Sequence, residues 1–336
     1  MQRFVSRKFI ITGFIIFILA GMSLTFIADI SQPVRRHSEA VLLDIPKGCR
    51  FVEIADILQR NGLIRNKISF SVLALFWGVV HQIKAGEYEI TTDMSPLMVL
   101  NKLITGDIKV YRMTIPEDLT AREIAERLSQ AGLIDRKDFD VLSRDKDFLQ
   151  SMHIEGETVE GYLYPETYYF NRSMDTKRVM QVMIGEFWKR VTPELQDRAG
   201  EMGLSVHDWI TLASLIGKET GYADEKTMVS AVFHNRLKRG MKLQSDPTAV
   251  YHLDSLNGPI RRKHLSMPSR YNTYHIGGLP PGPIANPGID SLMAALFPAK
   301  VNYLYFVAKN DGSHHFSTNY SSHYQAVRKY QVNEKK

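Results

Sequence analysis

The chain contains very little cysteine. Cys49 is the single cysteine among 336 residues, so the sequence excludes a disulfide within the chain, a Cys-based zinc knuckle and a CxxC redox pair. A surplus of one charge sign is also missing, because 42 Lys and Arg against 36 Asp and Glu give a formal net charge of only +6, spread along the chain. Nucleic-acid-binding proteins usually gather basic residues in arms or patches, so we expect no nucleic-acid partner.

The common catalytic motifs are absent as well. The sequence has no HExxH, no GxSxG, no P-loop and no GxGxxG at the start of a helix. Ser143 and Lys146 match SxxK, but they lie in a charged run without an SDN or KTG motif, which argues against a penicilloyl-type nucleophile. His314, His315 and His323 suggest a metal site, yet no carboxylate lies nearby at ligand spacing. We therefore predict neither a metal nor another cofactor.

A long hydrophobic run is present near the N-terminus. Residues 9–28 (FIITGFIIFILAGMSLTFIA) contain no charge, and a helix of about 20 residues spans the core of a bilayer. Arg3, Arg7 and Lys8 precede the run and favour a cytoplasmic N-terminus. The alternative is a cleaved signal peptide, but its apolar region is only about 7–15 residues long. We predict a cytoplasmic tail over residues 1–8, one membrane-spanning anchor over residues 9–28 in the cell (inner) membrane, and a periplasmic or otherwise extracytoplasmic remainder.

A repeat follows at an offset of 70 residues. IPKGCRFVEIADILQRNGLI (residues 45–64) and IPEDLTAREIAERLSQAGLI (residues 115–134) are identical at nine of twenty positions. Each copy predicts a strand ending in Ile-Pro, a turn, an amphipathic helix and a closing glycine, Gly62 or Gly132. The unit resembles small βααβ folds of LysM type, which bind glycan, although a purely structural spacer explains a duplication equally well. We predict a LysM-like domain over residues 40–150 that contains both copies.

The remaining chain, residues 151–336, predicts a second domain of mixed composition. EGYLYPETYYF (residues 160–170) is dense in aromatic side chains, which suit either a sugar platform or a half-buried strand. Helices are expected over residues 176–199, after residue 205 and up to Gly240, and Asp311-Gly312 separates two strand-like runs as a hairpin turn. The predicted fold class is α+β, with a transmembrane helix, a LysM-like small α/β domain and a mixed α+β domain.

One carboxylate lies in line with an apolar stripe. In LASLIGKETG (residues 212–221), Glu219 follows Leu215 by four residues and Ile216 by three, so a helix places it on their face. A carboxyl group removed from water has a raised pKa and holds its proton near neutral pH, the state that can protonate a glycosidic oxygen. The alternative is structural, since many such glutamates pair with an arginine or cap a loop.

Polar side chains occupy the loops that follow this helix. LQSDPT offers Gln244 and Asp246 beside a proline, and YNTYHIGGLPPGPIANPG carries Asn272 and Tyr274 in an irregular loop of the kind that frames a cleft. These residue types match the donors and acceptors of sugar hydroxyls. Loop geometry alone accounts for the prolines and glycines, so the loops by themselves do not define a function.

Four longer segments give a more specific signal. ASLIGKET, NRLKRGMKLQSDPTAVY, YNTYHIGGLPPGPIANPG and YLYFVAKNDGSHHFSTN resemble, in order and spacing, the YceG-like (MltG) endolytic murein transglycosylases, and the resemblance covers nearly the whole chain. It implies that Glu219, the second acid of an S-[IL]-[IV]-E-K-E pattern, is the catalytic residue, whereas Gly217 stands where many members have Glu. It also marks five positions near the cleft that we expect to bind substrate: Gln244, Asp246, Asn272, Tyr274 and His314.

The reaction that this resemblance implies is non-hydrolytic cleavage of the β-1,4 bond between N-acetylmuramic acid and N-acetylglucosamine, which leaves a 1,6-anhydro end and terminates strand elongation. Glu219 would serve first as general acid and then as general base. Two alternatives remain, a muramidase-type hydrolase with Asp246 as second carboxylate and a tethered, non-catalytic peptidoglycan-binding adaptor. The implied partners are peptidoglycan glycan strands, the membrane through one helix, and penicillin-binding proteins or other wall synthases.

Overall fold

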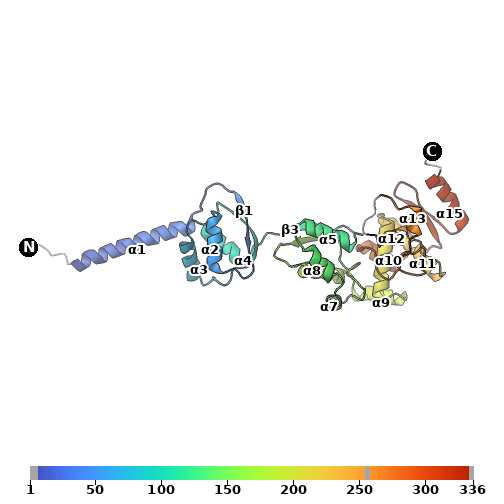
Figure 1. Ribbon diagram of the computed structural model, residues 1–336, viewed down its shortest axis with the longest axis horizontal. Helices are drawn as coiled ribbons and strands as arrows, with labels where there is room; N and C mark the ends of the chain where they lie inside the picture. The colour runs from blue at the N-terminus through green and yellow to red at the C-terminus, as the bar shows by residue number, and fades with distance from the viewer. Residues whose placement is uncertain (1–6, 254–257, 333–336) are drawn as a thin grey trace, which may run out of the picture. The chain divides into compact units, whose positions relative to one another are not determined.

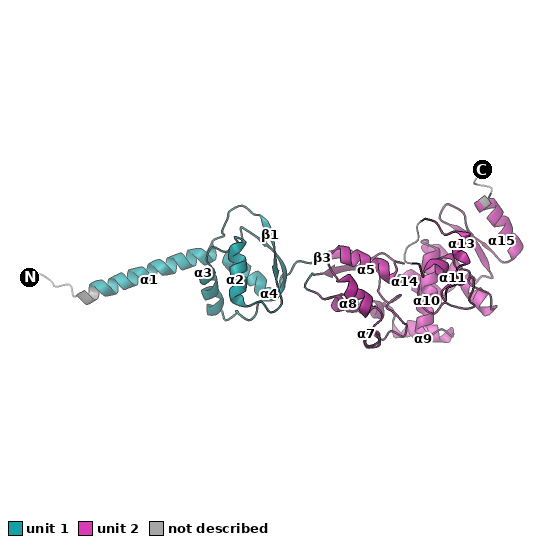
Figure 2. Ribbon diagram, in the orientation of Figure 1, with its two compact units in different colours: residues 1–111, 171–173 teal, residues 112–170, 174–336 magenta. Residues whose placement is uncertain are grey.

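The computed structural model describes residues 7–253 and 258–332 and has mixed α+β architecture with one apolar N-terminal helix (Figure 1). It forms two compact units (Figure 2): unit 1 comprises Met1–Tyr111 and Asn171–Ser173, and unit 2 comprises Arg112–Phe170 and Met174–Lys336. The α+β class predicted from the sequence is confirmed.

The N-terminal helix α1 (Arg7–Ser31) contains the hydrophobic run. Its segment Ile10–Ser31 is 22 residues long and is apolar enough to cross a membrane, since about 20 residues suffice. The predicted span over residues 9–28 lies within α1. Residues 1–6 of the predicted cytoplasmic tail lie outside the described residues.

Unit 1 packs three helices against a two-stranded antiparallel sheet. Its core is closed by fully buried side chains such as Leu58, Tyr88 and Leu100, and the two strands pair from Ala40 opposite Thr91 to Ile45 opposite Gly86. The elements of unit 1 after α1 are β1 (Ala40–Ile45), α2 (Phe51–Arg60), α3 (Lys67–Phe76), β2 (Gly86–Thr91) and α4 (Pro96–Thr105). The order β1-α2-α3-β2 has the predicted βααβ pattern.

Unit 2 is larger and mostly helical. Two-stranded sheets form between β3 and β4 and between β5 and β6, and the second of these is the hairpin predicted around Asp311-Gly312. Its first half contains β3 (Tyr111–Thr114), whose first residue belongs to unit 1, followed by α5 (Ala121–Gln130), α6 (Arg136–Leu142), α7 (Lys146–Ser151), β4 (Thr167–Phe170), α8 (Thr176–Arg190) and α9 (Pro193–Glu201). Its second half contains α10 (Val206–Glu219), α11 (Ala223–Lys238), α12 (Asp246–Val250), α13 (Arg262–Leu265), α14 (Ile289–Leu296), β5 (Tyr305–Ala308), β6 (His314–Ser317), α15 (Tyr320–Val327) and the π-helix η1 (Arg328–Val332).

Both copies of the repeat form the predicted local structure. Each has a strand, a turn and a helix, and Gly62 and Gly132 close the helices with φ of +68° in both cases, a conformation that favours glycine. The copies do not share a domain, however, because the second copy begins unit 2. The structure thus divides the chain after Tyr111, whereas we predicted a boundary near residue 150.

The second copy belongs to unit 2 because its turn is hydrogen-bonded there. The Asp118 backbone N donates to the Asn286 carbonyl at 2.9 Å. The Ala121 backbone N donates to Glu160 Oε1, also at 2.9 Å. These bonds connect the start of α5 to segments that come much later in the chain.

Helix α10 lies in the core of unit 2. It begins with a capping box in which Ser205 and Asp208 satisfy each other's backbone N–H groups. Trp209 is fully buried and donates from Nε1 to the Leu292 carbonyl of α14 at 2.8 Å. The helix ends at Glu219, because Thr220 is extended. This packing fixes the position of the backbone from which the Glu219 side chain extends.

The aromatic segment before α8 forms strand β4 and the turn before it. Tyr162, Tyr164 and Tyr168 are buried, whereas Tyr169 is exposed. Of the two interpretations of this segment, the structure therefore favours the half-buried strand and turn over an open sugar platform.

Candidate active site

Glu219 is the last residue of α10 and is half-buried. Leu215 and Ile216, which precede it on the same helix face, are fully buried, as the apolar period predicts. The Ser245 hydroxyl donates a hydrogen bond to Glu219 Oε1 at 2.5 Å. Ser245 itself is buried at the start of α12. The carboxyl group is thus held by a neutral hydroxyl group at the end of the helix.

Burial raises the pKa of Glu219 to about 7, and the negative charge of Asp246 acts in the same direction. The Ser245 hydrogen bond and the positive charge of Arg236 lower this pKa, but burial outweighs both. Glu219 can therefore carry a proton at neutral pH and also release it there. A group that acts first as an acid and then as a base needs a pKa of this kind.

Arg236 of α11 is buried close to Glu219 but serves mainly to hold loops. Its Nε donates to the Leu304 carbonyl at 2.7 Å, and its Nη1 donates to the Leu243 carbonyl at 2.7 Å and to Gln244 Oε1 at 3.4 Å. The structural alternative, in which an arginine pairs with Glu219 and removes it from chemistry, is not supported by these contacts. Arg236 instead supplies a positive charge near the carboxyl group while it anchors the loop before Ser245.

Gln244 lies in that loop with an unusual backbone conformation. Its φ is +51°, which is uncommon for a residue other than glycine, and its backbone N donates to the Thr273 carbonyl at 3.2 Å. Such strain is concentrated at functional sites. The side chain is exposed next to buried Ser245.

Asp246 and Tyr274 contact each other. The Tyr274 hydroxyl donates to Asp246 Oδ1 at 2.5 Å. Behind this pair, the buried Thr273 hydroxyl accepts from the Ser245 backbone N at 2.9 Å and lies 2.8 Å from Thr248 Oγ1. These hydroxyl contacts tie α12 to the loop of Tyr274, so four predicted residues, Glu219, Gln244, Asp246 and Tyr274, are linked through Ser245, Arg236 and Thr273.

Asn272 lies beneath this group rather than in it. Its side chain is fully buried, and Nδ2 donates to the carbonyls of Leu265 and Met267 at 3.0 and 2.8 Å. Its Oδ1 accepts from the Tyr274 backbone N at 3.0 Å. Because these bonds engage both ends of the amide, Asn272 shapes the loop that presents Tyr274, which differs from the substrate contact that we expected.

His314 lies in β6 and pairs with α11. Its Nδ1 is 2.7 Å from Glu225 Oε2, and its backbone N donates to Glu225 Oε1 at 2.9 Å. The ring also lies edge-on against Phe306. The contacts of His314 therefore join the hairpin to the first turn of α11 and do not link it to Glu219. Among residues 7–253 and 258–332, no three His, Cys, Asp or Glu side chains are grouped so as to hold a metal ion.

Sequence reasoning missed Ser245 and Arg236. Ser245 stands between two residues that we selected, but a serine before a short helix is ordinary and gave no signal. Arg236 did carry a signal, because it follows Val232 by four residues and Val229 by seven on a helix face that is buried. The periodicity that identified Glu219 would also have identified this arginine.

Gly217, where the pattern noted in the sequence has Glu, lies against a second carboxyl group, that of Asp118. A Cβ atom at position 217 would lie 1.9 Å from Asp118 Oδ1. Burial raises the pKa of Asp118 to about 6, and its Oδ1 has no hydrogen-bond partner among the described residues. Asp118 also has a φ of +62°, where the first copy of the repeat has Gly48 at +79°. Asp118, whose backbone has a conformation that favours glycine, thus lies against Gly217, the glycine at the position where that pattern has Glu.

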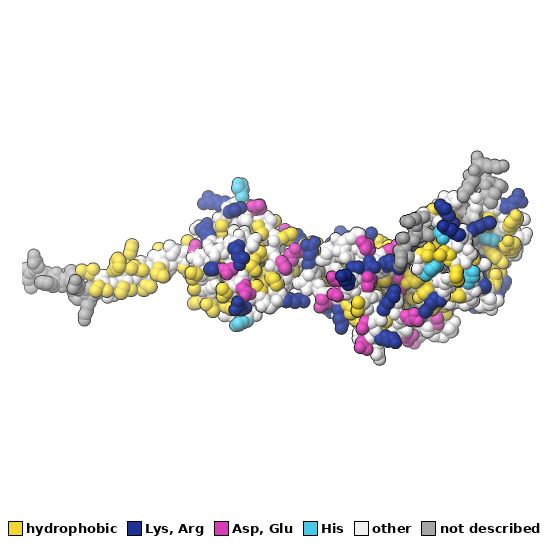
Figure 3. Space-filling model, in the orientation of Figure 1, with side chains coloured by type: hydrophobic (Ala, Val, Ile, Leu, Met, Phe, Trp, Pro, Cys, Tyr) yellow, Lys and Arg dark blue, Asp and Glu magenta, His cyan; other side chains and the backbone are white. Residues whose placement is uncertain are grey.

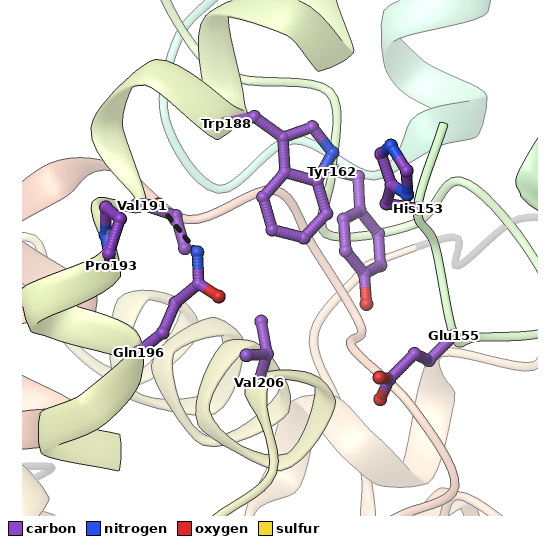
Figure 4. A pocket seen from close by; sticks show the side chains of 8 residues that line it. All are labelled: His153, Glu155, Tyr162, Trp188, Val191, Pro193, Gln196 and Val206. Carbon is purple, nitrogen blue, oxygen red and sulfur yellow. Dashed lines mark hydrogen bonds between the residues drawn. The ribbon is translucent and has the colours of Figure 1, made fainter. Parts of the chain in front are cut away.

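A cavity of about 460 Å³ opens elsewhere in unit 2 (Figure 4). Two of its polar side chains already have partners, since Trp188 Nε1 donates to the Met152 carbonyl at 2.8 Å and Gln196 Nε2 to the Val191 carbonyl at 3.1 Å. Its lining residues are His153, Glu155, Tyr162, Trp188, Val191, Pro193, Gln196 and Val206. None of the predicted site residues lines it, so we place the candidate active site at Glu219.

The arrangement around Glu219 places one carboxyl group with a pKa near 7 among polar loop residues, with the Asp246 carboxylate close enough to raise that pKa. The chain belongs to the YceG-like family, whose model matches residues 43–329. The family resemblance noted in the sequence is thereby confirmed.

Three relatives illustrate this membership. The endolytic murein transglycosylase of Bacillus subtilis (strain 168) is 31% identical over 332 residues, which cover 93% of this chain and 91% of the relative. The endolytic murein transglycosylase of Streptococcus pneumoniae serotype 2 is 27% identical over 92% of this chain, which spans 62% of that longer protein. The crystal structure of a YceG-like protein from Listeria monocytogenes superposes with a TM-score of 0.60 at 31% identity, covering 86% of this chain and 100% of that one.

Proposed function

We propose that this protein is a membrane-anchored endolytic murein transglycosylase. It would cleave the β-1,4 bond between N-acetylmuramic acid and N-acetylglucosamine inside glycan strands and leave a 1,6-anhydro end. The Bacillus and Streptococcus relatives carry the name of this activity. The observation that supports the chemistry best is the carboxyl group of Glu219, which burial holds at a pKa of about 7.

In the proposed reaction one carboxyl group serves both halves. Ser245 donates to Glu219 Oε1, which leaves Oε2 to carry the proton. That proton passes to the glycosidic oxygen as its bond to C1 breaks, and the resulting carboxylate is stabilised by the Ser245 hydrogen bond and the charge of Arg236. The carboxylate then takes the proton of the C6 hydroxyl as the C6 oxygen bonds to C1. Glu219 ends protonated, as it began, and no water is consumed.

Substitution of the acid tests this proposal. With the full chain in proteoliposomes and polymerised, uncrosslinked glycan strands as substrate, Glu219→Gln should lower the cleavage rate by at least about 100-fold, because general acid–base catalysis contributes at least that much. Glu194→Gln, which changes an exposed glutamate of α9, is the matched control and should keep the normal rate. Normal cleavage by Glu219→Gln would refute the single-acid mechanism. If neither the unaltered chain nor the variant cleaves, the non-catalytic adaptor is the better description.

Digestion in ¹⁸O-labelled water separates the transglycosylase from the two-carboxylate hydrolase. Asp246 is near enough for its charge to raise the pKa of Glu219, which makes it the natural second carboxylate of a hydrolase. Mass spectrometry should find unlabelled 1,6-anhydro ends. Reducing ends that carry ¹⁸O would instead assign a hydrolase.

The anchor and its orientation also belong to this proposal. We place the N-terminus in the cytoplasm and the rest of the chain outside it. We also propose that the LysM-like unit 1 binds glycan and that wall synthases are partners of the protein. Cys49, the single cysteine, is partly exposed in unit 1 and therefore reports the side on which this unit lies. A membrane-impermeant maleimide should label Cys49 in spheroplasts without permeabilisation. Labelling that requires permeabilisation would reverse the orientation.

A further inference from the structure

Helix α3 of unit 1 is apolar on both of its faces. One face packs into the core through Phe70, Leu73 and Ala74. The other face is open, and its apolar side chains recur at the spacing of one continuous stripe. The exposed fractions are 67% for Ile68, 46% for Val72, 66% for Leu75 and 87% for Phe76.

Such a stripe is unusual on a surface that faces only water. Soluble proteins rarely expose contiguous apolar patches, and a helix that is hydrophobic all round is normally buried on all sides. Between Ile68 and Phe76 the helix has no charged residue. Trp77, which is 45% exposed, follows at the helix end and extends the stripe with an aromatic ring. The open face therefore needs a second apolar environment.

The position of α3 next to α1 indicates what that environment is. Ser69 Oγ donates to Asp29 Oδ2 at 3.0 Å, so the first turn of α3 is bonded to the end of α1. Phe26 and Ile30 of α1 pack against the core of unit 1. Asp29 is the first charged residue after the hydrophobic run, and its contact with Ser69 therefore marks the depth at which the run ends. Helix α3 begins at this depth.

Figure 3 shows hydrophobic side chains along α1 and on the adjoining surface of unit 1. In Figure 1, α3 is drawn on the side of unit 1 that α1 joins. The exposed stripe thus lies on a helix that adjoins the end of the helix that we propose as the anchor.

We propose that the open face of α3, formed by Ile68, Val72, Leu75, Phe76 and Trp77, is seated in the headgroup and upper acyl region of the bilayer that α1 spans. Helices that lie in this region insert an apolar face by several ångströms, and tryptophan is enriched there. Because the stripe carries no charge, neutral lipid suffices and salt should have little effect. Unit 1 would then rest on the membrane surface and not move freely on a tether.

Tryptophan quenching in liposomes tests the proposal without a label. The chain has three tryptophans, Trp77, Trp188 and Trp209, and the last two lie in unit 2. In phosphatidylcholine liposomes that contain lipids brominated near the headgroup, the full chain should lose part of its fluorescence, and Trp77→Phe should abolish that loss. Quenching that is unchanged in Trp77→Phe, or absent from the unaltered chain, would overturn the proposal.

A spin label measures the same contact at another residue. In a Cys49→Ser background, labels at Phe76→Cys in α3 and at Val141→Cys in α6 compare two exposed apolar positions. The Phe76 label should be several-fold less accessible than the Val141 label to an aqueous nickel chelate and several-fold more accessible to oxygen. Equal access to the chelate would refute the insertion of α3. Flotation of the same liposomes checks the membrane anchor α1 separately. If the protein floats with the liposomes while the label at position 76 is exposed to water, α1 is inserted and only the proposed contact of α3 is wrong.

The same label decides between lipid and a second copy of the chain. The measurement is repeated in nanodiscs that hold one chain each. Shielding that persists there supports lipid as the occupant. Shielding that appears only when several chains share a bilayer would assign the stripe to contact between copies and refute the proposal.

Discussion

At the scale of the residue, the protonation of Glu219 should control the pH dependence of cleavage. The proposed reaction begins with Glu219 protonated, so kcat/KM should fall as the pH rises through the pKa of Glu219, which lies at about 7. Asp246→Asn removes a negative charge that raises this pKa, and the falling limb should move to lower pH. Ser245→Ala removes a hydrogen bond that lowers it, and the limb should move to higher pH.

The test is stringent because substitutions of two adjacent residues are expected to shift the falling limb of the pH profile in opposite directions. Asp197→Asn, which removes an exposed carboxylate of α9, serves as the control and should leave the limb in place. If Asp246→Asn and Ser245→Ala both reduce the rate but leave the limb unmoved, the group that titrates is not Glu219.

The residues of the site differ in how far the sequence reveals them. Glu219 is predictable because its place in a period of apolar residues determines its burial. The role of Asn272 is not predictable, because the local sequence around an asparagine that binds loop carbonyls does not differ from that around an asparagine that binds a sugar. His314 lies in a motif segment, but its partner Glu225 is set by tertiary packing between β6 and α11. Asp118 escaped notice for the same reason, because its role depends on contact with Gly217.

At the scale of the element, the contact between Asp118 and Gly217 of α10 can be tested by substituting alanine for each of two glycines. Gly217→Ala should lower the stability of unit 2 by about 1–3 kcal/mol, because the added Cβ would overlap Asp118 Oδ1. Gly185→Ala in α8 is the matched control, since nothing lies within 4 Å of the added atom. There alanine should stabilise the helix by up to about 1 kcal/mol. Thermal unfolding of the variants measures both changes.

Asp118→Gly removes the atom that Gly217→Ala would meet, and it restores the residue found in the first copy of the repeat. The destabilisation caused by Gly217→Ala should therefore shrink in the double variant, which is the non-additivity expected of contacting residues. Strictly additive effects would show that Asp118 does not occupy the space above Gly217.

Elements were easier to predict than their assembly. Helix α10, the hairpin of β5 and β6 and the strand–helix units of the repeat follow from local periodicity, capping and turn residues. The open stripe of α3 was not predicted, because a helix with apolar residues on both faces looks like an ordinary buried helix in the sequence. Only the exposed fractions in the folded unit separate its two faces.

At the scale of the whole molecule, the sequence predicted one anchor and two domains with a boundary near residue 150, whereas the structure divides the chain after Tyr111. A duplication suggests that its two copies pack together, so we assigned both to one domain. The turn of the second copy instead bonds to Asn286 and Glu160, which lie far along the chain. Sequence similarity between the copies contains no information about these later partners.

The division after Tyr111 predicts two unfolding transitions for the full chain in detergent micelles. Ile90→Val in unit 1 and Ile184→Val in unit 2 are matched substitutions, because both side chains are fully buried and each loses one methylene, at a cost of about 0.5–1.5 kcal/mol. In calorimetry each variant should lower the midpoint of one transition and leave the other in place. A single transition that both variants shift would mean that the two units unfold as one cooperative body, because a loss of packing in either unit would then lower the midpoint of their shared transition.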